Sequence, residues 1–174
     1  MNIEDRNFEG FMDYLKKTFL YPEIKSVCIY RSACKFCKSK NPLRRLWWSY
    51  RWLKMRRRGY QISLKAKIGR GLSFLHDGPR IIVKDARIGE DCTVGINVVI
   101  GYGYKDGYFA PTIGDRVYIG HNSSVVGNIT VGNDVLIAPN SFVNRDVPSH
   151  SIVVGNNQII KKESPSAPYL KIGP

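Results

Sequence analysis

Aliphatic residues return at every sixth position through the C-terminal half of the chain. They are Ile113, Ile119, Val125, Val131, Ile137 and Val143. An α-helix cannot keep every sixth residue on one face, because each of its turns takes 3.6 residues. A simple hairpin sheet would not hold one phase for so long. A sustained short period is the signature of a repeat architecture, so the pattern predicts a β-solenoid with these side chains inside.

A second series of small or aliphatic residues, also six apart, accompanies the first, with each member four positions after one of the first series. It comprises Val117, Ser123, Ile129, Val135, Ser141 and Val147. Gly114, Gly120 and Gly132 each follow a residue of the first series. We expect these glycines to turn tight corners, using backbone conformations that other residues reach only with strain.

The six-residue step extends upstream with two interruptions. Its positions there are Ile62, Ile68, Phe74, Ile82, Ile88, Val94 and Ile100. The phase slips by two residues after Phe74 and by one after Ile100. Interruptions of a solenoid are where loops leave the coil, and such loops commonly carry function on a rigid scaffold. The first interruption contains His76 and the second the Gly- and Tyr-rich run 101–111, so both point to a functional site.

From Phe8 to about Arg58 the apolar residues instead recur at helical spacing, with breaks at Pro22 and Pro42. This predicts two or three short helices. The last, 42–60, holds Trp47, Trp48, Tyr50 and Trp52 among seven Lys and Arg residues, a composition typical of a basic amphipathic helix on an anionic membrane surface. The alternative is that its aromatic side chains pack against the fold or a neighbouring subunit. Nucleic-acid binding is disfavoured because no recognised binding motif accompanies the segment.

Charge and hydropathy narrow the class of protein further. The chain has 27 Lys and Arg against 14 Asp and Glu, and the net charge of +13 favours an anionic partner without choosing among nucleic acid, acidic lipid and a phosphorylated small molecule. No stretch reaches the roughly 20 apolar residues that span a bilayer, and the acidic N-terminus lacks a signal-peptide pattern. We expect a cytoplasmic protein, with 42–60 able to make a peripheral contact at the inner face of the membrane.

The cysteines do not form a metal-binding pattern. Cys34 and Cys37 make a lone CxxC, and Cys28 and Cys92 supply no second pair at ligand spacing. A closed structural zinc site needs four ligands. We therefore expect no metal, and reduced thiols in a helical segment.

Several short motifs occur in a fixed order along the repeat. Residues 66–71 read AKIGRG and lead to His76, 110–115 read APTIGD, 126–132 read VGNITVG, and Val147-Pro148 follow. This set, which spans about residues 62–162, resembles the hexapeptide-repeat acyltransferases. Within them it is most similar to the serine acetyltransferase branch, including O-acetyltransferases from capsule and exopolysaccharide gene clusters of the colanic acid type.

The resemblance implies a fold and an assembly. The family's fold is an all-β left-handed parallel β-helix with three strands per coil, usually a homotrimer with acetyl-CoA in the clefts between subunits. For this chain we expect about five coils of roughly 18 residues. The expected division is a helical segment over 1–59, a β-helix acyltransferase domain over 60–162 and a C-terminal tail over 163–174.

The resemblance also assigns a catalytic base. Acetyl transfer to a hydroxyl needs a group that takes the proton as oxygen attacks the thioester, and the pKa of histidine suits this work near neutral pH. His76 stands at the family's position for the base; the alternative is a structural histidine in a loop. Backbone N–H groups of Gly101 to Gly103 are the expected donors to the oxyanion.

The group that orients this histidine departs from the family pattern. In the serine enzymes a carboxylate on the preceding coil pairs with it, and the matching residue here is Gln61. Glutamine can fix the tautomer of His76 but stabilises an imidazolium less than a carboxylate does. Either the base is weaker, or Asp77 or Asp85 supplies the charge.

The residues expected to contact the acceptor also differ from those of the serine enzymes. The residues expected to meet the acceptor are Leu75, Asp77, Phe109 and Ala110. Leu75, Phe109 and Ala110 stand where the serine enzymes hold the ammonium and carboxylate groups of serine, and charged ligand ends are not buried without partners. These apolar positions, with Tyr102, Tyr104 and Tyr108 in the same loop, favour a sugar ring and predict that free serine is a poor substrate.

Acetyl-CoA contacts are expected along the later coils. Candidates are the backbone around Gly101, Gly103, His121 and Ala138, with Lys161 and Lys162 for the phosphates. Pro139 has no N–H to donate. His121 is otherwise a solvated corner residue, the two lysines are otherwise a solvated tail, and His150 is expected at the surface.

These expectations combine into one leading hypothesis and two rivals. The hypothesis is an acetyl-CoA-dependent O-acetyltransferase acting on a hydroxyl of a sugar or polysaccharide precursor, either a small molecule or lipid-linked. The first rival is a serine O-acetyltransferase of cysteine biosynthesis. The second is a non-enzymatic β-helix binding protein, because repeat folds also serve as interaction surfaces.

Overall fold

The computed structural model describes residues 22–103 and 107–170. Two helices, α2 (Pro22–Phe36) and α3 (Pro42–Arg57), precede a series of short strands and a final 3₁₀ turn, η1 (Ala167–Tyr169). The strands are β1 (Tyr60–Ile62), β2 (Lys67–Ile68), β3 (Ser73–Phe74), β4 (Arg80–Ile82), β5 (Arg87–Ile88), β6 (Thr93–Val94), β7 (Val98–Gly101), β8 (Thr112–Ile113), β9 (Tyr118–Ile119), β10 (Ser124–Val126), β11 (Thr130–Val131), β12 (Val135–Ile137), β13 (Phe142–Val143), β14 (Ser151–Val154) and β15 (Gln158–Lys161).

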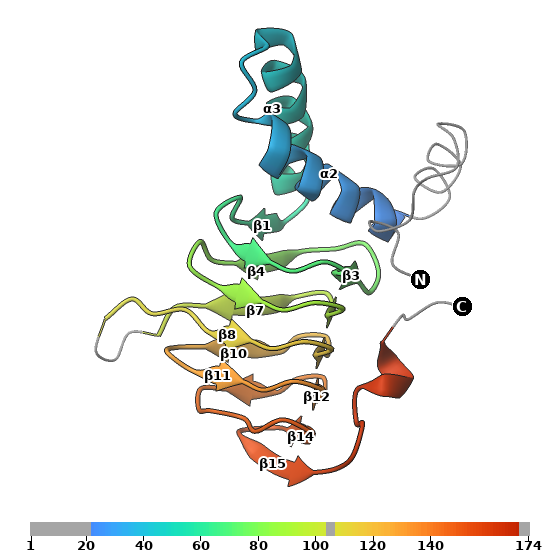
Figure 1. Ribbon diagram of the computed structural model, residues 1–174, viewed down its shortest axis with the longest axis vertical. Coiled ribbons are helices and arrows are strands. Elements are labelled where there is room, and N and C mark those ends of the chain that lie inside the picture. The colour runs from blue at the N-terminus through green and yellow to red at the C-terminus, as the bar shows by residue number, and fades with distance from the viewer. Residues whose placement is uncertain (1–21, 104–106, 171–174) are drawn as a thin grey trace.

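The strands form a three-sided parallel solenoid of about five turns, as expected from the period (Figure 1). Its first face has the strand order β1-β4-β7-β10-β13 and its second β11-β8-β5-β2. Its third has the order β15-β14-β12-β9-β6-β3, in which only β15 runs antiparallel to its neighbour. The chain visits the three faces in turn, so each coil has a 1–2, a 2–3 and a 3–1 corner, named by the faces that they join.

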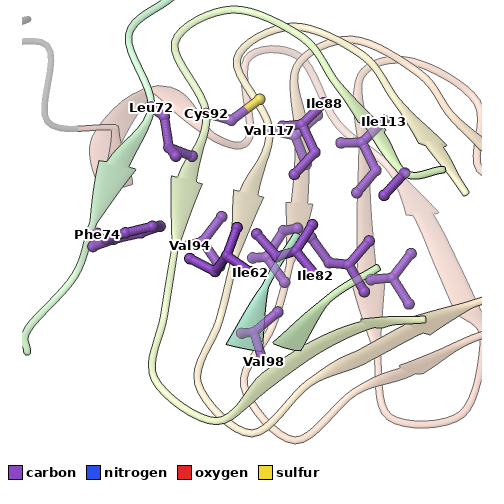
Figure 2. Packing of buried hydrophobic residues seen from close by; sticks show 14 of the residues in the cluster. Ile62, Leu72, Phe74, Ile82, Ile88, Cys92, Val94, Val98, Ile113 and Val117 are labelled. Atoms are coloured by element: carbon purple, nitrogen blue, oxygen red, sulfur yellow. The ribbon is translucent and has the colours of Figure 1, made fainter. Parts of the chain in front are cut away.

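The six-residue period is confirmed as the inward-facing pattern. Every residue of the series from Ile113 to Val143 is at most 2% exposed. The strand register stacks like on like, for instance Ile82 on Ile100 and Ile100 on Val125 along the first face. Figure 2 shows core side chains such as Ile62, Ile82 and Ile113 pointing into the space between the faces. Since neighbouring strands lie about 4.8 Å apart, each aliphatic side chain packs directly on the one in the next coil.

The expected reason for Gly114, Gly120 and Gly132 is wrong. None of the three has a positive φ; in each of these three repeats the left-handed residue comes two positions later and is Arg116, Asn122 or Asp134, with φ 52°, 58° and 52°. The next coil excludes a side chain instead. A Cβ on Gly120 would lie only 2.5 Å from the Pro139 nitrogen, so the glycine permits close stacking of the coils.

Both prolines that interrupt the helical pattern begin helices rather than break them. The α3 start is capped, because the Asn41 side chain accepts a hydrogen bond of 3.1 Å from the Arg44 N–H. The helix ends at Arg57, slightly before the expected bound of 60. The apolar pattern that begins at Phe8 lies outside the described residues until Pro22.

The two helices cover the end of the solenoid at which the first coil begins (Figure 1). Trp52 and Met55 of α3 are buried and share one core cluster with Tyr30 of α2 and with Ile62 and Phe74 of the first coil. A solenoid needs such a cap, since its terminal coil would otherwise expose the core to water. No helix in the described ranges has the length and apolar character to cross a membrane.

Candidate active site

His76 lies at the 3–1 corner of the first coil, in the loop that joins β3 to β4. Its backbone has φ 64°, a left-handed conformation that is costly for a residue with a side chain. The interruption predicted from the sequence is therefore a loop of two extra residues at a corner. Such a conformation persists only when its surroundings hold it.

Arg80, the first residue of β4, stabilises this loop by hydrogen bonds to its backbone. Its guanidinium donates to the carbonyl oxygens of Leu75 at 2.8 Å, His76 at 2.7 Å and Gly78 at 2.7 Å, and to that of Val94 in the next coil at 3.2 Å. The side chain is 1% exposed, and burial lowers its pKa. A buried guanidinium is tolerated here because carbonyl oxygens receive its N–H groups.

Sequence reasoning missed Arg80, although the signal was present. The residue stands two positions before Ile82, where the second series has small or aliphatic side chains in every later repeat. The guanidinium also lies 4.4 Å from the centre of the Phe74 ring, a cation–π distance. A charged residue at an inward position of a solenoid was the clue to a functional loop.

Asp77 links the same loop to α2 and to β1 by hydrogen bonds. Its carboxylate accepts hydrogen bonds from the Ser26 hydroxyl of α2 at 2.9 Å and from the Tyr60 hydroxyl. The Gly78 N–H in turn donates to the Tyr60 oxygen at 3.0 Å. Burial, followed by the bond to Asp77, raises the pKa of Tyr60. This carboxylate is thus engaged away from the histidine whose charge it was expected to balance.

The other expected partners of His76 are also elsewhere. Asp85 accepts from the Tyr102 hydroxyl at 2.9 Å, at a 1–2 corner. Gln61 is the middle residue of β1, paired in register with Ile81, and its side chain is exposed on the first face. Within the described ranges no hydrogen bond joins Gln61, Asp77 or Asp85 to the His76 ring, so the expected orientation of the tautomer by one of them is absent from the single chain.

The side chain that does meet His76 is His121, from the 3–1 corner two coils further on. The two rings are stacked, with centroids 5.6 Å apart and planes inclined by 24°. Gly95 makes this possible: it lies at the same corner of the intervening coil, and a Cβ there would be 2.9 Å from His121 Nδ1. The lack of a side chain at Gly95 lets the imidazole reach past one whole coil.

The protonation of His121 follows from its surroundings. Its Nδ1 accepts a hydrogen bond of 3.0 Å from the Ile96 N–H, so a neutral ring carries its proton on Nε2. Burial lowers the pKa of His121, and the nearby His76 and Arg80 lower it further. His121 is therefore a neutral donor beside His76, and the pair offers a base and an N–H group on one side of the fold.

The loop 101–110 lies at a different corner. It leaves the coil between β7 and β8, at a 1–2 corner, whereas His76 and Leu75 lie at a 3–1 corner. Figure 1 shows the loop extending from one edge of the solenoid and β3 at the opposite edge. Phe109 is 47% exposed and Ala110 is half-buried. The structure therefore does not bring Phe109 and Ala110 to His76 within one chain.

One expected oxyanion donor is occupied. The Gly103 N–H donates to the Phe109 carbonyl oxygen at 3.0 Å and closes the loop, so the expectation that it is available to a substrate is wrong for the single chain. Gly101 ends β7 and is buried. Tyr104 lies outside the described residues.

The remaining candidates for the acetyl-CoA site spread along the solenoid. Ala138 lies at the 3–1 corner of the coil after His121, but its N–H donates to the Val153 carbonyl oxygen at 2.9 Å. Lys161 and Lys162 are exposed beyond the last coil. Four of the residues described above lie at the 3–1 corners of successive coils. They are His76, Ile96, His121 and Ala138, named here the corner column.

His150 and the four cysteines lie away from the His76 loop or form no metal site. His150 is exposed at a 2–3 corner, as expected, with Nδ1 2.8 Å from the Asp134 carboxylate. The four cysteines are free thiols, and the part of the chain that the structure describes contains no group of three His, Cys, Asp or Glu side chains able to hold a metal ion.

Comparison with known proteins places this geometry in a family. Residues 110–145 match the family model described as bacterial transferase hexapeptide (six repeats). A serine acetyltransferase from Helicobacter pylori is 38% identical over 141 residues, which cover 79% of this chain and 80% of that protein.

Solved structures agree. The serine acetyltransferase of Brucella abortus in complex with coenzyme A matches with a TM-score of 0.70 at 25% identity, over 91% of this chain and 62% of that one. The enzyme of Neisseria gonorrhoeae in complex with serine matches with a TM-score of 0.69 at 25% identity, over 91% and 64%. This chain thus spans less than two thirds of either crystallised protein.

These relatives correct the narrower resemblance to colanic acid and capsular O-acetyltransferases, which they do not support. They do account for the solenoid and for the two helices near its N-terminal end. On these grounds the chain belongs to the hexapeptide-repeat acetyltransferase family, with serine acetyltransferases as its homologues.

Proposed function

We propose that this protein is an acetyl-CoA-dependent O-acetyltransferase and that its acceptor is L-serine. The observation that carries the proposal is the serine acetyltransferase that is 38% identical over 80% of its own length. Supporting it, the first coil presents a histidine base on a rigidly held loop, and the coenzyme A complex shows that a related solenoid binds this molecule.

In the proposed reaction His76 takes the proton of the acceptor hydroxyl while that oxygen attacks the acetyl carbonyl carbon. A C–O bond forms as the C–S bond of the thioester breaks, and His76 returns its proton to the leaving thiolate. The Nε2–H of neutral His121 is a suitable donor to the oxygen that becomes negative during attack. The lowered pKa of His121 favours the neutral ring that this donation requires.

The separation of the two loops supports a proposed homotrimer. Within one chain the 101–110 loop and the corner column lie at different corners. In a trimer whose three-fold axis runs parallel to the solenoids, one copy's loop would lie beside the next copy's column. Phe109 and Ala110 would then contact an acceptor held at the neighbouring His76. Acetyl-CoA would lie along the corner column, with Lys161 and Lys162 near its phosphates.

A second candidate acceptor is a saccharide hydroxyl, favoured by one observation. Leu75, beside His76, and Phe109 and Ala110 in the loop are apolar where a serine site needs partners for charged groups. The tyrosine rings at 102 and 108 lie 6.1 Å apart in an edge-on arrangement, and such rings suit contact with a sugar ring. The relatives support serine more strongly than they support a sugar.

The acceptor is tested by thiol release from acetyl-CoA with L-serine and with a panel of nucleotide sugars and oligosaccharides. We expect turnover with serine at a kcat/KM of about 10⁴ M⁻¹s⁻¹ or above. Release with a saccharide and none with serine would instead establish the second candidate.

Replacing the base should remove chemistry and spare cofactor binding. For His76→Ala we expect a fall in kcat of about 10²-fold to 10⁴-fold with the dissociation constant of coenzyme A nearly unchanged. His150→Ala is the matched control, since this histidine is exposed at another corner, and it should keep wild-type kcat. Equal kcat in wild type and His76→Ala would exclude His76 from the mechanism.

Arg80 should act as a positioning residue. Arg80→Lys keeps the charge but loses the planar fork that reaches several carbonyl oxygens, so the His76 loop should shift. We expect kcat to fall by about 10-fold to 10²-fold with KM for acetyl-CoA unchanged. Arg87→Lys, at the first residue of β5, is the control. A variant that unfolds at lower temperature yet keeps full kcat would assign Arg80 to stability alone.

A further inference from the structure

Helix α3 has two apolar faces, and only one of them is covered. Trp52 and Met55 face α2 and the first coil and are 8% and 4% exposed. The opposite face carries five large apolar side chains at helical spacing. They are Leu43 (78% exposed), Leu46 (69%), Trp47 (56%), Tyr50 (57%) and Leu53 (48%).

This set, named here the α3 apolar face, is the main concentration of exposed apolar surface among the described residues. The other large exposed hydrophobic side chains are scattered over the solenoid and its last segment. Single exposed hydrophobic residues are ordinary on protein surfaces, whereas a contiguous stripe marks a binding surface. These five side chains are exposed, and α3 lies at the end of the molecule opposite the last coils (Figure 1).

The charge of the same region identifies the kind of partner. Residues 24–76 contain 15 Lys and Arg and no Asp or Glu, whereas the rest of the chain has 12 basic and 14 acidic residues. The whole positive net charge therefore resides in the helices and the first coil. Seven of these basic residues lie between 44 and 58 and flank the α3 apolar face.

We propose that the α3 apolar face docks on an anionic lipid bilayer. The apolar side chains would enter the boundary between head groups and acyl chains, and the flanking Arg and Lys side chains would reach the lipid phosphates. A second copy of the same face is a poor occupant, because two helices without a single acidic residue would bring like charges together. Lipid phosphates supply the missing negative charge.

Docking in this way has a consequence for the active site. The first coil, which carries His76, is the one nearest the helices, and Ser26 of α2 is bonded directly to Asp77 in the His76 loop. A bilayer bound to the α3 apolar face would therefore lie beside the pair of helices that contacts the His76 loop.

The first test uses the intrinsic fluorescence of the full chain. All three tryptophans, Trp47, Trp48 and Trp52, belong to α3, so their emission reports on this helix alone. With vesicles of phosphatidylcholine and phosphatidylglycerol we expect a shift to shorter wavelength that weakens as salt is raised, and little shift with phosphatidylcholine alone. An equal shift with both vesicles, or none with either, would overturn the proposal.

The second test is co-sedimentation of variants with the anionic vesicles. Trp47→Ser/Tyr50→Ser removes apolar surface and Lys54→Gln/Arg57→Gln removes charge; each should lower the partition coefficient by about tenfold or more. Matched controls lie near the other end of the solenoid. Phe142→Ser/Ile160→Ser and Lys161→Gln/Lys162→Gln change the same kinds of exposed side chain and should sediment like wild type.

Two other partners of the α3 apolar face can be detected with the same proteins: a second copy of the chain and RNA. If Trp47→Ser/Tyr50→Ser lowers the oligomeric state in light scattering, the face joins copies of the chain and the proposal fails. Binding of the wild type to RNA but not to vesicles would overturn it as well. Neither measurement involves acetyl-CoA or an acceptor, so failure of lipid binding leaves the proposed acetyl transfer to be judged on its own.

Discussion

The stacking of one coil directly on the next is the constraint on which the structure depends. From Ile82 onward, coils about 4.8 Å apart leave room inside only for small or aliphatic side chains and, at positions such as Gly120, for no side chain at all. Function must then come from places where the repeat is interrupted. The loop of His76 and the loop 101–110 are these places, and Arg80 and Gly95 show how the solenoid adapts to the first of them.

The fold could be predicted from the sequence because the six-residue period follows from the way the coils pack. Ile113 and its equivalents are buried because they recur with the coil, so spacing alone identified the core. Spacing could not reveal contacts that cross coils. The His76–His121 stack joins residues 45 positions apart in the sequence, and it exists because Gly95 between them lacks a side chain. The role of Arg80 was hidden for a similar reason, since its acceptors are backbone carbonyl oxygens that no side-chain motif records.

The site's chemistry is divided between two corners of one chain. The base and its neighbouring donor lie on the corner column, whereas the residues expected to distinguish serine from a sugar lie partly on the opposite loop. This division explains why apolar residues at Phe109 and Ala110 do not by themselves decide the acceptor: in the proposed trimer their position relative to His76 would be set by a second copy. Acetyl transfer is therefore expected to be a property of the assembly, with the fold of the single chain supplying both halves.

The most direct test of this account is complementation between two inactive variants. One carries His76→Ala; in the other the 101–110 loop is shortened to the length of an ordinary corner. Each alone should lack acetyl transfer, whereas co-expressed chains should form mixed oligomers in which an intact loop faces an intact His76, and activity should return. Mixed oligomers that remain inactive would contradict the central claim that two copies complete each site.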